Sequence, residues 1–159
     1  MKLRILSVAH KMPAWVQAGF DEYFKRILPM MAVEVVEIAP AKRSKNPSIA
    51  EVDKYKQAEG QAILNARHAK EVLWVLEVKG KMISTESLAD KLETAMQDGR
   101  DVALVIGGAD GVSADVLAAA DFKWSLSDLT LPHPLVRVVL IEQLYRAMSI
   151  INHHPYHRA

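Results

Sequence analysis

The feature that most constrains the fold is a regular alternation of short apolar runs with helical patterns. Four runs rich in Val, Leu and Ile are typical of buried strands, at residues 3–8, 33–38, 71–78 and 102–106. Between them, the spacing and the capping residues predict helices over 14–28, from Ser48 onward, and from Ser84 or Thr85 to Gly99. Alternating strands and helices form a parallel sheet with helices on both faces. The predicted fold class is therefore α/β.

The rest of the chain continues this pattern. Ser113 begins a short helix, residues 124–126 are a candidate fifth strand, and a final helix begins near Pro134. With 159 residues and no linker, the chain 1–159 is predicted to be a single domain. The final helix is apolar over most of its circumference, which a surface helix of a small monomer would not tolerate. This favours a homodimer interface, and the alternative is a core helix enclosed within one subunit.

Composition limits the chemistry. The chain has no cysteine, which excludes disulfide scaffolds, thiolate zinc sites and cysteine nucleophiles. Residues 1–70 carry twelve Lys or Arg against seven Asp or Glu, whereas residues 71–159 carry eight against twelve. Such a split marks a face for a polyanion, or it arises by chance on a solvated surface. The apolar segment 135–151 is interrupted by charges, so we expect a soluble, cytoplasmic protein that does not associate with membranes.

Familiar nucleotide-binding and hydrolytic motifs are absent. The first strand is not followed by a glycine-rich dinucleotide turn, and there is no phosphate-binding loop, nucleophile elbow or HExxH motif. Three other strand ends are followed by turn-forming residues. These segments are LEVKGK at 76–81, GGADG at 107–111 and SLSDLTLPHP at 125–134. The carboxyl ends of parallel strands meet at one edge of a sheet, where ligands bind. Each turn is either part of one pocket or a simple connection.

Two polar segments lie outside these turns. The loop PAKRSKNP contains Lys42, Arg43 and Lys45. Together with Lys54 and Lys56 on the next helix, they would contact nucleic-acid phosphates or simply be solvated. The terminal HHPYHRA would by default be disordered, and adjacent histidines without a carboxylate are weak evidence for a metal site. No metal is expected.

Three motifs together identify a resemblance. IGGADG at 106–111, SLSDLTLPHPLVRVVLIEQLYRA at 125–147 and HPYHR at 154–158 closely resemble the bacterial ribosomal RNA large-subunit methyltransferase H family, over essentially the full chain. The resemblance implies a SPOUT-class α/β fold with a C-terminal trefoil knot and a homodimer. It also implies methyl transfer from S-adenosyl-L-methionine to N3 of a pseudouridine in 23S ribosomal RNA, on the assembled ribosome.

Carried over motif by motif, the resemblance implies a set of cofactor contacts: Leu76, Gly108, Ser127, Asp128, Leu129, Thr130, Leu131 and Pro132. The family commonly has aspartate where this chain has Glu77, which puts a side-chain role at that position in doubt. In the tail, His157 is expected to act as the base or to orient the uracil edge. Arg158 would stabilise charge on the carbonyl oxygens, and Tyr156 would stack on or position the base. Without cysteine, transfer must be direct.

Two other readings stay open at this point. One is a SPOUT enzyme that methylates a different RNA, such as a transfer RNA. The other is a nucleotide-binding module that uses the glycine turns and catalyses nothing. The Tyr-His-Arg tail argues against the second, because a binding module has no need of it.

Overall fold

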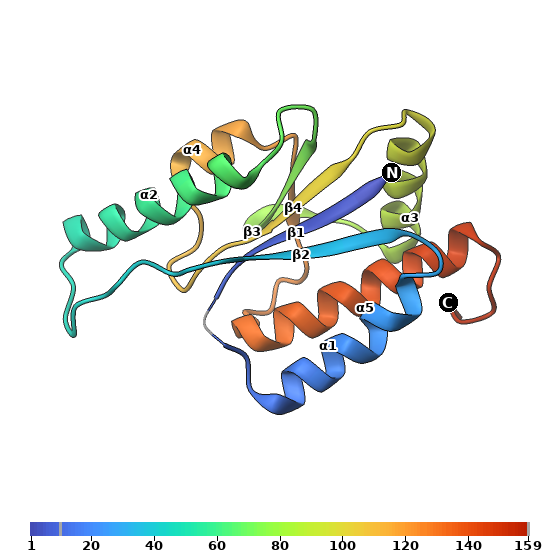
Figure 1. Ribbon diagram of the computed structural model, residues 1–159, viewed down its shortest axis with the longest axis horizontal. Helices are drawn as coiled ribbons and strands as arrows, with labels where there is room; N and C mark the ends of the chain where they lie inside the picture. Colours follow the sequence, from blue (N-terminus) through green and yellow to red (C-terminus); the bar gives the residue numbers. More distant parts are fainter. Residues whose placement is uncertain (10, 159) are drawn as a thin grey trace.

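The computed structural model describes residues 1–9 and 11–158, and its elements follow the predicted order. They are β1 (Lys2–Val8), α1 (Ala14–Ile27), β2 (Ala32–Ile38), α2 (Ile49–Ala66), β3 (Val72–Met82), α3 (Thr85–Gln97), β4 (Val102–Ile106), α4 (Ala114–Ala119), β5 (Phe122–Ser125) and α5 (His133–Ile151). Figure 1 shows the strands as one twisted layer between helices.

All strand pairs are parallel, in the order β2-β1-β4-β3-β5. In the register, Leu3 of β1 lies between Val33 of β2 and Val102 of β4. Because the strands are parallel, the carboxyl ends of β1, β3 and β4 lie on the same side of the sheet. The predicted α/β class is confirmed.

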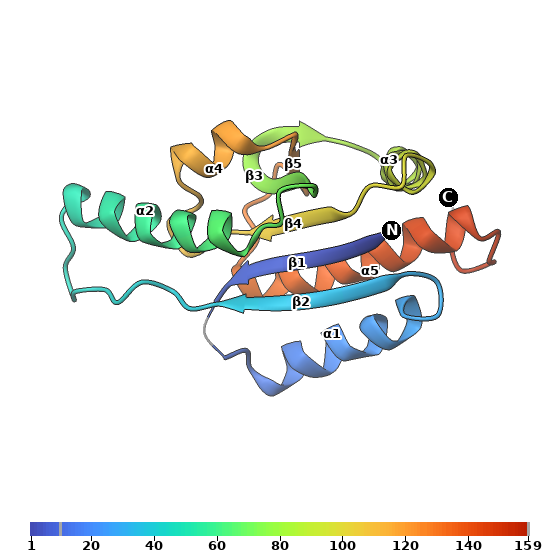
Figure 2. The same cartoon turned by 45° about the horizontal axis from the view of Figure 1, so that its top comes forward.

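Helices cover both faces of the sheet, as the apolar strands require. Leu3, Ile5 and Leu104 belong to one buried cluster, which α1, α3 and α5 cover, whereas Leu6 and Val105 belong to a second cluster under α2 and α4. Figure 2 shows α1 and α5 on one side of the strands and α2 and α4 on the other. The alternation of side chains along each strand thus builds two cores.

Serine side chains cap three of the helices. Ser48 forms a capping box with Glu51 at the start of α2, and Ser113 caps α4. At α3 the cap is Ser84 rather than Thr85, because the Ser84 hydroxyl accepts a hydrogen bond from the Ser87 N–H. Each such cap stabilises its helix by about 1 kcal/mol.

The third strand is longer than predicted. It was expected to end at Val78, but β3 continues to Met82 after a break in its pairing with β5 between Leu76 and Lys81. A Cβ on Gly80 would lie 2.8 Å from backbone atoms of Lys123 and Trp124. Only glycine therefore allows the two backbones to approach, and the intervening residues bulge out of the sheet.

The last helix, α5, packs between α1 and α3 beneath the sheet. Leu140, Ile141 and Leu144 are fully buried in its middle, so much of its apolar surface is enclosed within one subunit. Its first turn is different, because Leu135 is exposed. Among the described residues, no helix is both long and apolar enough to cross a bilayer.

Candidate functional site

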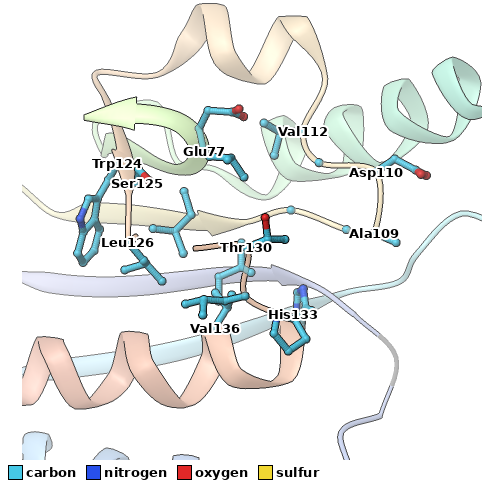
Figure 3. Close-up of a pocket in the computed structure, with 18 of the residues that line it drawn as sticks. Glu77, Ala109, Asp110, Val112, Trp124, Ser125, Leu126, Thr130, His133 and Val136 are labelled. Atoms are coloured by element: carbon cyan, nitrogen blue, oxygen red, sulfur yellow. The ribbon is translucent and has the colours of Figure 1, made fainter. Parts of the chain in front are cut away.

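One cavity of about 620 Å³ opens at the carboxyl ends of β3 and β4. Three segments far apart in the sequence line it, namely 76–78 in the β3 bulge, 106–112 after β4 and 124–133 between β5 and α5. Figure 3 shows their side chains converging on the hollow below the strand ends. The three turns that the sequence singled out therefore form one pocket.

The glycine turn after β4 presents backbone to this cavity. Gly111 has a φ of 84°, and its N–H donates to the Gly108 carbonyl at 3.0 Å. A Cβ on Gly107 would lie 2.7 Å from Val112 Cγ1, and one on Gly108 would lie 2.6 Å from Glu59 Oε1. The turn has no room for larger side chains, and its bare backbone can closely approach a ligand.

The segment after β5 forms the opposite wall. Of the cofactor contacts predicted there, five line the cavity, namely Ser127, Leu129, Thr130, Leu131 and Pro132. The sixth, Asp128, is not among the lining residues. The Ser127 hydroxyl accepts a hydrogen bond from the Leu129 N–H at 2.9 Å, which shapes the turn. Leu129 is 74% exposed, so this large apolar side chain lies open to solvent at the mouth of the cavity.

The β3 bulge supplies Leu76, as predicted, and also Glu77. The bulge places Glu77 in the cavity wall (Figure 3), so the side chain whose role was in doubt is available to a ligand. Lys56, from the middle of α2, also lines the cavity. The sequence indicated Lys56 only as a phosphate contact beside the basic loop, because its place in the cavity wall depends on how α2 packs over the sheet.

His133 is a lining residue that the sequence suggested only as a helix-cap residue. It begins α5, its ring lies near the Gly107 backbone, and its Nε2 is buried with no hydrogen-bond partner among the described residues. Burial, together with the nearby Arg137 guanidinium, lowers the pKa of His133 below its usual value. The imidazole is therefore neutral at pH 7 and lies between the start of α5 and the glycine turn.

This neutral histidine makes stability depend on pH. The unfolded chain takes up the proton near the usual histidine pKa of about 6.5, whereas the folded chain resists it. The free energy of unfolding should therefore fall as the pH drops from 7 to 5, and the fall should be smaller in His133→Asn. Urea unfolding at the two pH values measures both. An identical pH dependence in the two proteins would contradict the assignment.

The predicted catalytic residues of the tail are ordered against α5 and α3. The Tyr156 hydroxyl donates to Glu142 Oε1 at 2.9 Å, and its ring lies 4.8 Å from the Arg146 guanidinium. His157 contacts Arg146 through Nδ1 at 3.3 Å and Glu86 through Nε2 at 2.9 Å. The tail is thus a packed cluster, and the default expectation of disorder is wrong for it.

Within this cluster, Glu142 and Arg146 are residues that the motif reading passed over. Glu142 also accepts two hydrogen bonds from Arg146, at 2.6 and 2.9 Å. Burial and the bond to Glu142 raise the pKa of Tyr156 well above its usual value. The phenol is therefore protonated at neutral pH and can donate a hydrogen bond but cannot serve as a base. Arg158 is exposed beside the cluster.

The tail cluster and the cavity lie at opposite ends of α5. The cavity contains His133 at the first position of the helix, and the tail follows its last residue, Ile151. A helix of 19 residues spans about 28 Å. Figure 1 shows the C-terminus beyond one end of α5 and the loop from β5 at the other. Within one subunit, the structure does not bring the predicted catalytic and cofactor residues together.

The basic loop lies next to the glycine turn. Lys42 and Lys45 are exposed, whereas Arg43 forms an ion pair with Asp110 of the turn. Of the described residues, no group of three or more His, Asp or Glu side chains could hold a metal ion.

Comparisons with known proteins agree with this fold. A family model described as "Predicted SPOUT methyltransferase" matches residues 1–157. The ribosomal RNA large subunit methyltransferase H of Psychrobacter cryohalolentis is 71% identical, with 99% of each chain covered. The protein of the same name from Acinetobacter baumannii is 58% identical, with both chains fully covered. In structure, the chain is similar to the tRNA (m1G37) methyltransferase of Aquifex aeolicus, with a TM-score of 0.54, 17% identity and coverage of 100% of this chain and 76% of that one.

The parallel sheet with helices on both faces is that of a SPOUT-type methyltransferase fold. The chain belongs to the SPOUT methyltransferases and, among them, to the ribosomal RNA large subunit methyltransferase H family.

Proposed function

We propose that the protein transfers a methyl group from S-adenosyl-L-methionine to N3 of a pseudouridine in 23S ribosomal RNA, on the assembled ribosome. The observation that carries the proposal is the convergence of the three predicted cofactor turns on one cavity, in a chain up to 71% identical to ribosomal RNA methyltransferases. A ribosomal substrate implies that the enzyme works in the cytoplasm, and the family implies the trefoil knot.

The cavity suits the cofactor in size and lining. S-adenosyl-L-methionine, when bound, supplies the electrophilic methyl group. Leu76, Leu131 and Val136 offer apolar surface for an adenine ring, as ligand pockets commonly do. Gly108 and residues 127–131 lie outside the helices and named strands. Their backbone groups, apart from those already bonded within the turns, can therefore pair with the polar edges of the ligand.

A homodimer would complete the site. The tail cannot reach the cavity of its own subunit without spanning the length of α5, about 28 Å. An isologous dimer pairs the same surface of two subunits, so the tail of one can lie at the cavity of the other. Exposed apolar residues near the start of α1 and α5, Trp15 and Leu135, would be covered by such a partner.

The tail then supplies the chemistry at the base. N3 must lose its proton as the methyl group arrives, and the reacting atoms must be held about 3 Å apart. His157 accepts that proton or orients the uracil edge, while Arg158 stabilises the negative charge that develops on the carbonyl oxygens. Tyr156, which stays protonated, positions the base by stacking or by hydrogen bonding. Lys42 and Lys45 contact RNA phosphates.

Nucleoside mass spectrometry of ribosomal RNA from a strain that lacks the gene tests the proposal. We expect methylpseudouridine to disappear from 23S RNA and to return when the wild-type gene is supplied. The methylated nucleosides of transfer RNA, measured in the same way, should be unchanged in this strain. An unaltered level of methylpseudouridine in 23S RNA would refute the substrate, and loss of a methylated base from transfer RNA would favour the other SPOUT reading.

A further inference from the structure

The basic loop and the glycine turn of the cavity are joined by a charged contact. Arg43 of the loop pairs with Asp110 of the turn, and the two side chains are 30% and 24% exposed. Figure 3 shows Asp110 at the outer end of the turn, with its carboxylate directed away from the cavity. Asp110 therefore uses its side chain to hold the turn from outside, while its backbone lies in the cavity wall.

Arg43 itself is held in place by α2. Its guanidinium lies 5.5 Å from the centre of the Tyr55 ring, and the Tyr55 hydroxyl accepts a hydrogen bond from the Ser44 N–H at 3.0 Å. A cation over an aromatic face gains about 0.5–1 kcal/mol at an exposed site. The loop is thereby fixed at the point where it reaches Asp110.

A buried carboxylate makes a second connection between the same segments. Glu59 of α2 is 3% exposed, and its Oε2 accepts a hydrogen bond from the Ala41 N–H at 2.9 Å. Its Oε1 lies directly behind Gly108. Loop residues 41–43 are thus linked to the turn at two points: through Glu59 behind Gly108, and directly at Asp110. A phosphate-binding role for Arg43 would require it to leave Asp110.

We propose that Arg43 is a positioning residue for the cofactor site, which holds the turn 107–111 in its binding shape through Asp110. Lys42 and Lys45, its neighbours in the loop, are the cations that face RNA. The inference rests on the proposed function, because it takes the cavity to be the S-adenosyl-L-methionine site. A turn held in its bound shape loses less entropy when the ligand arrives.

Calorimetric titration of the dimeric full-length protein with S-adenosyl-L-methionine, in the absence of RNA, tests this. Arg43→Gln is expected to raise the Kd about two- to fivefold, which corresponds to the loss of one ion pair near the protein surface. Arg43→Lys keeps the positive charge, so it should retain much of the wild-type affinity for the cofactor. Lys42→Gln and Lys45→Gln remove a charge from the same loop and should leave this Kd unchanged, while they weaken binding to ribosomal RNA and reduce its salt dependence.

Two further measurements separate positioning from general stability. In steady-state assays, Arg43→Gln should raise the KM for the cofactor and leave kcat at saturating cofactor unchanged. Arg26→Gln, which breaks the exposed pair with Glu22 on α1, should change neither. In a double-mutant cycle, Asp110→Asn should add little in a chain that already carries Arg43→Gln.

The inference is wrong if Arg43→Gln binds the cofactor like the wild type, or if Lys42→Gln and Lys45→Gln weaken cofactor binding by the same factor. Failure of the wild-type protein itself to bind S-adenosyl-L-methionine would instead overturn the proposed function.

Discussion

Two inactive variants are expected to form an active enzyme when they share a dimer. One carries Gly108→Val in the cavity, and the other carries His157→Ala with Arg158→Ala in the tail. The tail lies at the far end of α5 from its own cavity. The proposed dimer therefore builds each site from the cavity of one subunit and the tail of the other. In a mixed dimer, one of the two sites then has both parts intact. Random pairing predicts about a quarter of wild-type activity in a symmetric dimer.

Co-expression of the two chains, followed by a methyl-transfer assay on ribosomes, measures this. The matched control pairs His157→Ala with Arg158→Ala in separate chains. There, both changes fall in the same part of the site, so every dimer should remain inactive. If co-expressed cavity and tail variants were as inactive as either alone, the tail would not act in the partner's site.

Gly108→Ala is expected to weaken S-adenosyl-L-methionine binding by at least about tenfold. The new methyl group would lie 2.6 Å from Glu59 Oε1 and 3.3 Å from Val8 Cγ1, so the turn would have to move into the cavity. Both neighbours are packed against other groups, since Glu59 also accepts the Ala41 N–H. Calorimetric titration with the cofactor gives the loss of affinity directly.

A second glycine provides the matched control. A Cβ on Gly19, in α1, would meet only Val138 at an ordinary 3.6 Å, and alanine favours a helix, so Gly19→Ala should bind normally and be slightly more stable. Adding Glu59→Ala to Gly108→Ala removes the obstructing oxygen and should recover part of the affinity. Wild-type affinity in Gly108→Ala would show that the turn does not form the binding surface.

The strands and helices were predictable because their signals are local. Val102 to Ile106 is an unbroken apolar run, and the capping serines lie where helical spacing begins. The length of β3 was not predictable, because it depends on a contact between Gly80 and the backbone of β5. A glycine in a strand signals a close approach, but the sequence does not say to which backbone.

The cofactor side of the site followed from the rule that parallel strands end together, and the three turns do converge. The sequence did not identify His133 or the Glu59 carboxylate as site residues, and it indicated Lys56 only as a phosphate contact. Their places depend on how α2 and the first turn of α5 pack. The partner of Arg43 was missed for the same reason, since Asp110 lies 67 residues further along the chain. The sequence does not distinguish a charged loop residue that is solvated from one that forms an ion pair.

The packing of the tail was also not predictable from the sequence. Its residues were identified by resemblance, but neither the resemblance nor the periodicity predicted that Glu142 and Arg146 would order them. In sequence, these two charges only interrupt an apolar helix. Their arrangement one turn apart on α5 creates a surface against which Tyr156 and His157 pack.

Transfer of a labelled methyl group from S-adenosyl-L-methionine to ribosomes purified from the deletion strain tests the central claim most directly. The proposal predicts label in 23S RNA, recovered by nucleoside mass spectrometry as a pseudouridine methylated at N3, and none with protein that carries His157→Ala and Arg158→Ala. Label on another RNA, or no label at all with protein that binds the cofactor, would contradict it.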